Sequence, residues 1–148
     1  MIRKSLTKNF VFVWEKDPAL DKEHEGFAEA WAAYEESLDP AVLPVVTGET
    51  LAKFVCQPLS MGGYGRMMSE PSEFNRCIEA VRYSLKSMSG YSIDGIEIKI
   101  EEGDKQKDGL DHRLKDSFLN KIWDPMLFVA LGLAIIKSSV LDPTRAVG

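Results

Sequence analysis

The chain has 148 residues, of which 45% are hydrophobic and 28% charged, and its net charge is −5 with a pI near 5.1. This size and composition fit one globular domain, residues 1–148. The acidic balance disfavours nucleic acid and anionic membranes as partners. The longest apolar run, residues 126–136, is shorter than the roughly 20 residues that cross a membrane. The N-terminal run "FVFVW" is too short for a signal peptide, so we expect a soluble, cytoplasmic protein.

The first half of the chain predicts two strands and a helix. Residues 9–14, "NFVFVW", are mostly β-branched or aromatic, which indicates a short strand with both faces covered. Residues 21–39 predict a helix that has Asp21 as its N-cap, ends at Asp39-Pro40 and carries one apolar stripe, Phe27, Trp31, Tyr34 and Leu38. Residues 51–59 indicate a second strand, which Pro58 ends.

The second half predicts three more helices and one more strand. Residues 72–88 form the clearest helical pattern, followed by Gly90 as a stop, with an apolar stripe of Phe74, Cys77, Ile78, Val81, Leu85 and Met88. Isoleucines alternate with charges over residues 96–101, which is typical of a half-buried strand. Residues 103–109 are expected to be a mobile polar loop. Apolar residues recur at every fourth position at Leu110, Leu114, Phe118 and Ile122, and this spacing predicts another helix. A last helix is predicted to begin at Pro125.

These elements predict an α+β fold, in which a small sheet of about three to four strands packs with about four helices. The strands and helices do not alternate as in a doubly wound sheet. The last residues, "DPTRAVG", are expected to fray.

The stretch 60–68, "SMGGYGRMM", invites a phosphate-binding interpretation. A phosphate loop needs a lysine and a hydroxyl after its last glycine, whereas Arg66 and two methionines stand there. A dinucleotide fingerprint needs a third glycine where Met68 lies. We therefore expect a flexible apolar loop, which either covers an edge of the core or contacts a partner. The residues predicted to contact a partner are Met61, Tyr64, Arg66, Met67 and Met68.

Other chemistry-bearing residues have simpler explanations. Cys56 and Cys77 both lie in apolar segments and are expected to be core thiols, with a disulfide as the alternative. His24 has no second histidine four residues away to form a metal pair, and His112 has no nucleophile at a suitable helical spacing. Glu101, Glu102 and Asp104 are expected to be solvated charges. We expect no catalytic residue, no metal and no cofactor.

The order of segments carries a resemblance. "WAAYEESLDPAVLPVVTGETLAKFVCQPLS", "RCIEAVRYSLKSMSGYSIDG" and "LKDSFLNKIWDPMLFVALGLAIIKSSVLDP" follow one another over residues 31–141. This order is similar to that of small accessory proteins encoded among the structural genes of tailed bacteriophages. The resemblance implies a virion component of the head, neck or tail, or an assembly chaperone. Such a protein acts in the host cytoplasm during assembly or stays in the virion.

The resulting hypothesis is a non-enzymatic interaction protein whose partners are other phage structural proteins or a second copy of itself. Two alternatives remain open. One is a small enzyme or ligand-binding protein that uses Cys77, His112 or an acidic cleft. The other is a phage-encoded antagonist of host defence. The first alternative requires that the fold bring Cys77 or His112 to a carboxylate in a concave pocket.

Overall fold

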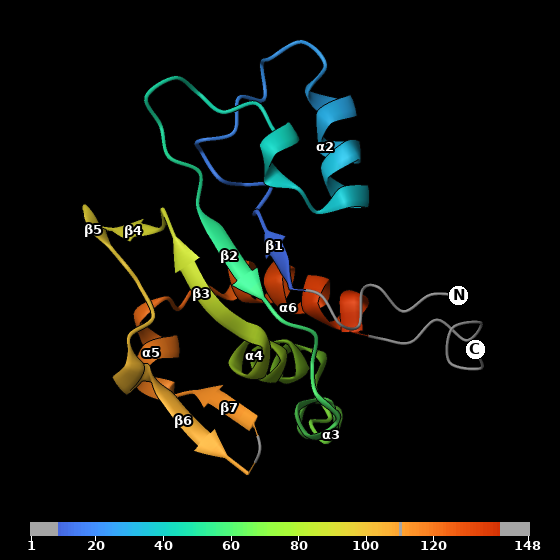
Figure 1. Cartoon of the computed structure of the whole chain (residues 1–148), viewed down its shortest axis with the longest axis vertical. Helices are drawn as coiled ribbons and strands as arrows, with labels where there is room; N and C mark the ends of the chain where they lie inside the picture. The colour runs from blue at the N-terminus through green and yellow to red at the C-terminus, as the bar shows by residue number, and fades with distance from the viewer. Residues whose placement is uncertain (1–8, 110, 140–148) are drawn as a thin grey trace, which may run out of the picture.

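The computed structural model describes residues 9–109 and 111–139. Within these residues the fold is α+β, with five α-helices and three small antiparallel sheets of three, two and two strands (Figure 1). The elements in chain order are β1 (Phe10–Phe12), α2 (Phe27–Ser37), the 3-10 turn η1 (Pro40–Val42), β2 (Lys53–Cys56), α3 (Met61–Met68), α4 (Glu73–Ser84), β3 (Leu85–Ser89), β4 (Ser92–Ile93), β5 (Ile96–Glu97), the 3-10 turn η2 (Glu102–Asp104), β6 (Lys105–Asp108), β7 (Asp111–Leu114), α5 (Asp116–Lys121) and α6 (Pro125–Ser139).

The three-stranded sheet has the order β1-β2-β3, with β2 in the centre and both pairs antiparallel. Phe54 of β2 faces Phe12 on one side and Met88 on the other. Helix α6 passes behind this sheet in Figure 1, and α4 packs against α6. The main core lies among these elements, and its fully buried members include Phe54, Phe118, Leu127, Phe128, Leu131 and Ile135.

Helix α6 confirms the prediction of a buried apolar helix that starts with Pro125. Asp124 caps it, since its carboxylate accepts from the N–H groups of Met126 and Leu127. Gly132 lets α6 approach α4 closely, because a Cβ at this position would lie 2.6 Å from the Cα of Cys77. No helix in the described part of the chain combines the length and apolarity needed to cross a membrane.

A second, smaller core holds together the segment around α2. Tyr34, Leu20, Leu43 and Leu51 are buried there beside Val13 and Ala19. The Tyr34 hydroxyl ties α2 to the end of β1, because it donates to the Val11 carbonyl at 2.6 Å and accepts from the Val13 N–H at 2.7 Å. The Asp17 carboxylate accepts from the N–H groups of Ala19 and Ala52, both at 2.9 Å, and so joins the two ends of the segment.

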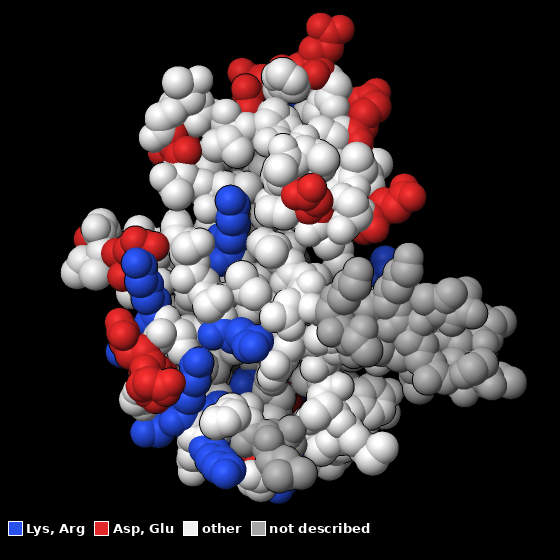
Figure 2. All heavy atoms as spheres, viewed as in Figure 1, with Lys and Arg blue, Asp and Glu red and all other residues white. Residues whose placement is uncertain are grey.

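This segment, residues 17–52, is named the acidic lobe. It holds nine acidic residues and a single basic one, Lys22, whereas residues 53–139 hold twelve of each sign. Figure 2 shows acidic side chains over the upper part of the molecule, around α2, and basic side chains gathered lower down, over β3 and the β6–β7 hairpin. The net negative charge is therefore concentrated at one end of the long axis.

Helix α2 is shorter than predicted. It begins at Phe27 rather than near Asp21, and its N-cap is Gly26, with φ +85°. Residues 21–26 form turns instead, in which the Asp21 N–H donates to the Pro44 carbonyl. The helix ends at Ser37 because Leu38 adopts a left-handed conformation with φ +56°.

The predicted helix over residues 72–88 is wrong in its last turn. Ser72 is the N-cap, and α4 ends at Ser84, after which the chain enters β3. Leu85 and Met88 pair with Cys56 and Phe54 of β2 instead of extending the helical stripe. Sheet pairing therefore outweighs helix propensity here. Gly90, with φ +75°, packs its backbone closely against the Leu51 carbonyl and is not a helix stop.

Residues 96–122 also differ from their predictions. Instead of one strand over 96–101, the hairpin β4–β5 ends at Glu97, and Ile96 is 68% exposed while Ile98 and Ile100 pack on the core. The predicted mobile loop 103–109 contains η2 and β6. The predicted helix from Leu110 is strand β7 followed by the short helix α5. Leu110 itself and the predicted frayed tail lie outside the described residues.

Candidate functional site

The stretch "SMGGYGRMM" is a helix, not the predicted loop. Ser60 caps α3 by accepting a hydrogen bond from the Gly63 N–H at 3.0 Å. Three glycines weaken helix propensity, so packing has to supply the missing stability. Met67 is buried at 1% exposure, and Gly63 lies against Tyr83 of α4, where a Cβ would come within 3.2 Å of the Tyr83 Cβ. The serine cap was the signal in the sequence that could have indicated this helix.

The outward face of α3 carries an apolar stripe. Met61, Gly65 and Met68 recur at i, i+4 and i+7 and so share one face of the helix. Met61 is 93% exposed and Met68 is 47% exposed. Of the five predicted contact residues, Met61, Arg66 and Met68 are exposed, and Tyr64 is half-buried. The prediction that Met67 contacts a partner is wrong, because its side chain is buried in the core.

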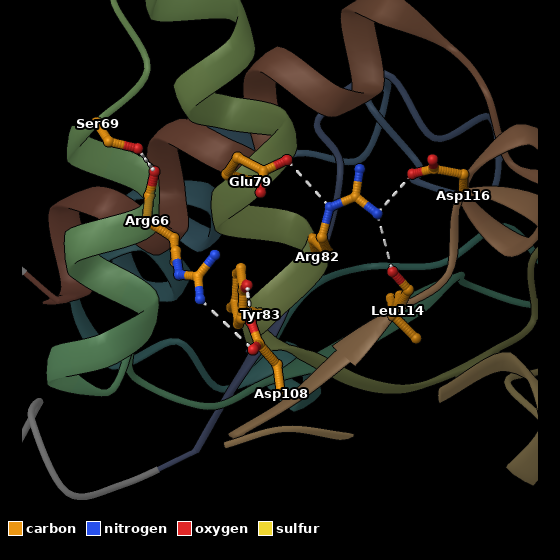
Figure 3. Close-up of polar contacts among 8 residues, drawn as sticks. All are labelled: Arg66, Ser69, Glu79, Arg82, Tyr83, Asp108, Leu114 and Asp116. Carbon is orange, nitrogen blue, oxygen red and sulfur yellow. Dashed lines mark hydrogen bonds and ion pairs between the residues drawn. The ribbon is translucent and has the colours of Figure 1, made fainter. Parts of the chain in front are cut away.

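Arg66 fixes α3 to the β6–β7 hairpin (Figure 3). Its guanidinium lies 3.5 Å from the Asp108 carboxylate, which also accepts a 2.6 Å hydrogen bond from the Tyr83 hydroxyl. The hydrogen bond from Tyr83 is the main reason that the pKa of Asp108 is lowered. Burial first, and then Asp108, raise the pKa of Tyr83. The helix and the hairpin are thus held side by side by a shared carboxylate.

Arg82 forms a second polar cluster one residue away. Its Nε lies 3.0 Å from the Glu79 carboxylate, and its Nη1 contacts Asp116 at 2.6 Å and the Leu114 carbonyl at 3.0 Å (Figure 3). Burial lowers the pKa of Arg82, but the hydrogen bonds to Asp116 and Glu79 outweigh burial and the pKa is raised. Its Nε and Nη1 thus contact groups of α4, β7 and α5, so Arg82 holds these three elements together.

Beside these clusters lies a pocket of about 280 Å³, here named the basic pocket. Lys86 of β3, Lys105 of β6 and Arg113 of β7 line it, together with His112, and Glu102 is its one acidic lining residue. Lys86, Lys105 and Arg113 take part in none of the four ion pairs found among the described residues. These three cations therefore form no direct ion pair among the described residues, although Glu102 lines the same pocket and Arg113 helps to lower the pKa of Asp108.

Arg113 is the most distinctive residue of the basic pocket. Its guanidinium lies 5.9 Å from the centre of the Tyr83 ring, within the range of a cation–π contact. Its Nε–H is buried and, among the residues that the structure describes, has no hydrogen-bond partner. A buried donor without a partner is costly.

Together, the exposed stripe of α3 and the basic pocket are named the contact surface. The fold brings them together from four elements, and Asp108 joins them by contacting both Arg66 and Tyr83. The sequence did not indicate that Lys86, Lys105 and Arg113 lie together, because they belong to β3, β6 and β7, which are adjacent only in the folded chain. The lysines in "DKQKD" and the basic "HRLK" were the available signals.

The fold does not bring Cys77 and His112 together, although His112 lines the basic pocket with the carboxylate of Glu102. Cys56 and Cys77 are free, buried thiols, as predicted, and burial raises the pKa of each. The Cys77 thiol points to the Val129 carbonyl of α6, whereas His112 lines the basic pocket, whose lining does not include Cys77. His24 is exposed on the acidic lobe.

The carboxylates near Glu101 have structural partners. Asp104 is buried, contrary to the prediction of a solvated charge, and accepts from the Glu101 N–H at 2.8 Å while lying 3.9 Å from the Lys121 ammonium. Glu101 and Glu102 are exposed, as predicted. The described residues contain no group of three or more histidine, cysteine or acidic side chains that could hold a metal ion.

A second pocket and a group of exposed apolar residues on α6 lie outside the contact surface. A pocket of about 380 Å³ lies between the acidic lobe and the sheet, but the Asp17 carboxylate in its lining is already bound to backbone N–H groups. Trp123, Met126 and Leu133 are exposed at the start and along the outer face of α6. Neither feature combines apolar area with uncompensated charge as the contact surface does.

In comparisons with known proteins, no protein-family model, no curated protein and no solved structure matches the chain.

Proposed function

We propose that this protein is a non-enzymatic interaction protein that binds an acidic protein partner through the contact surface. The observation that carries the proposal is the convergence of three cations without ion pairs on a pocket whose lining residue Tyr83 packs against α3, the helix that exposes Met61 and Met68. Arginine and methionine are enriched at protein interfaces, and methionine adapts to irregular partner surfaces. The partner expected from this chemistry presents carboxylates beside apolar side chains.

The contact surface suits binding because its parts are already in place. Arg66 is held by Asp108, and the Arg113 guanidinium is held over the Tyr83 ring. A surface that is ordered before binding loses less conformational entropy when the partner arrives. A carboxylate that enters the pocket gains charge-assisted hydrogen bonds, which are about twice as strong as neutral ones.

The finer part of the proposal concerns the setting. The resemblance of residues 31–141 to phage accessory proteins suggests a partner among the structural proteins of the head, neck or tail. On this proposal the protein acts in the host cytoplasm during assembly or stays in the virion. This part rests on the sequence resemblance alone.

A titration with a polyglutamate peptide tests the proposed chemistry. In ¹H–¹⁵N spectra of the full chain, the backbone amide signal of Arg113 is expected to shift on addition of the peptide, because carboxylates of the peptide bind in the pocket that Arg113 lines. Lys86→Gln/Lys105→Gln should weaken the binding. Lys99→Gln/Lys137→Gln is the matched control, because both lysines are exposed and neither lines the pocket. An unmoved Arg113 signal, or equal weakening by both variants, would contradict the proposal.

A further inference from the structure

The acidic lobe is the second surface of this molecule whose charge is not compensated. Its exposed carboxylates take part in none of the ion pairs formed within the described ranges, and they are Glu23, Glu25, Glu29, Glu35, Glu36, Asp39 and Glu49. Lys22 is the only basic residue of the lobe. The chain thus carries one surface with unpaired cations and another with unpaired carboxylates.

These two surfaces cannot neutralise each other within one molecule. Figure 2 shows acidic side chains alone around α2, whereas basic side chains gather over β3 and the β6–β7 hairpin, with acidic ones beside them. In Figure 1 the three-stranded sheet lies between α2 and the β6–β7 hairpin. A carboxylate of the lobe reaches a basic pocket only on another copy.

We infer that the acidic partner of the contact surface is the acidic lobe of a second copy of this chain. The inference rests on the proposed function, which assigns an acidic protein surface to the basic pocket. A glutamate from the lobe supplies a carboxylate to Lys86 and Lys105, which line the pocket beside Arg113 and take part in no ion pair among the described residues. Lobe and pocket are opposite in sign, and complementary charges fix both the register and the choice of partner.

Each copy carries both surfaces, so the contact can be used twice. Two copies in antiparallel orientation form both pairs at once and close into a dimer, whereas a single head-to-tail contact repeated along a series gives a ring or a chain. The net charge of −5 opposes association at long range. This repulsion is screened beyond about 8 Å at physiological ionic strength, whereas ion pairs at the contact remain.

Sedimentation velocity of the full chain over a range of concentrations tests the inference. The wild type is expected to associate, and the association should weaken as salt is raised. The pocket variant Lys86→Glu/Lys105→Glu and the lobe variant Glu25→Lys/Glu35→Lys/Glu36→Lys should each associate at least about tenfold more weakly, because like charges now meet. The control, Lys99→Glu/Lys137→Glu, makes the same change in net charge as the pocket variant but lies outside the pocket.

Mixing the two reversed variants gives the decisive result. The lobe that now carries lysines should bind the pocket that now carries glutamates. Association should therefore return in the mixture, although each variant alone associates weakly. This rescue cannot come from a variant that has failed to fold. A wild type that stays monomeric at all concentrations, or a mixture without rescue, would overturn the inference.

The result is separable from the test of the proposed function. If polyglutamate shifts the Arg113 signal while the chain stays monomeric, the pocket binds acidic proteins but the second copy is not its partner. If polyglutamate has no effect and the chain still associates with charge-swap rescue, the proposed binding of acidic proteins in general is contradicted, whereas the contact between two copies stands. If both fail, the proposed function fails with the inference.

Discussion

At the scale of single residues, Tyr34 makes the clearest link between the acidic lobe and the sheet. Its hydroxyl is both donor and acceptor to backbone groups of β1 and the residue that follows it. Tyr34→Phe removes both hydrogen bonds and leaves the Val13 N–H buried without a partner. We expect a loss of about 2 kcal/mol in the free energy of unfolding, measured by urea denaturation. Tyr64→Phe is the control, since its hydroxyl has no partner among the described residues, and it should change little.

The same residue predicts how stability depends on pH. Burial raises the pKa of Tyr34 from 10.0 to about 12. The folded state therefore favours the neutral phenol, and this contribution is fully present below the unfolded pKa of 10.0. It is lost as pH rises from 10.0 towards 12. Denaturation curves over this range should show a loss of stability in the wild type that is smaller in Tyr34→Phe, and equal losses in both would contradict the assignment.

Two adjacent methionines of α3 should respond oppositely to the same substitution. Met67 is 1% exposed and Met68 is 47% exposed. Met67→Ser is expected to lower the free energy of unfolding by at least about 2 kcal/mol, because a buried side chain is truncated and a hydroxyl is placed in the core. Met68→Ser should change it by less than about 0.5 kcal/mol. Thermal denaturation of the two variants measures the difference, and similar melting temperatures would show that α3 is not docked as described.

At the scale of elements, α6 and α3 each use glycine, but for different reasons. A Cβ at Gly132 would lie 2.6 Å from the Cα of Cys77 and 2.8 Å from its carbonyl oxygen, whereas a Cβ at Gly65 meets nothing within 4 Å. Gly132→Ala should therefore separate α6 from α4 and cost about 2 kcal/mol or more. Gly65→Ala should stabilise by about 0.5–1 kcal/mol, because alanine is the better helix former. Stabilisation by both substitutions would mean that α4 and α6 are not in close contact.

Secondary structure was predictable where a segment showed one periodic pattern and no distant strand paired with it. The apolar residues after Pro125 indicated α6, and Phe74, Cys77 and Val81 indicated α4 up to Ser84. The prediction failed at Leu85 and Met88, which fit the helical stripe but pair with Cys56 and Phe54 in the sheet. Periodicity within a segment does not reveal which distant strand will compete for it.

Helix α3 and strands β6 and β7 were not predicted, because their sequences carry only weak local signals. Helix α3 contains three glycines, and its stability comes from Met67 and from the contact of Gly63 with Tyr83, both of which depend on the folded chain. Strands β6 and β7 are charged and short, so neither shows an apolar alternation. Met61, Arg66 and Met68 were found from residue type alone, but the basic pocket needed the meeting of three strands.

At the scale of the whole molecule, charge is distributed unevenly in a way that overall composition conceals. The pI near 5.1 and net charge of −5 argued for an acidic protein, yet the excess lies in residues 17–52, and the remainder carries a basic pocket. An average over the chain cannot separate a uniformly acidic surface from two opposed ones. The function proposed here depends on that separation, because each surface needs a partner of the other sign.

The measurement that tests the central claim most directly is a pull-down of the tagged full chain from its native source, with co-purifying proteins identified and quantified by mass spectrometry. Three variants are compared with the wild type: Met61→Ser/Met68→Ser, Lys86→Glu/Lys105→Glu, and the control Met126→Ser/Leu133→Ser, whose residues are comparably exposed on α6. The account predicts stoichiometric capture of an acidic protein or of untagged copies of this chain, lost in the first two variants and retained in the control. Equal capture by all four proteins, or loss only in the α6 control, would contradict it.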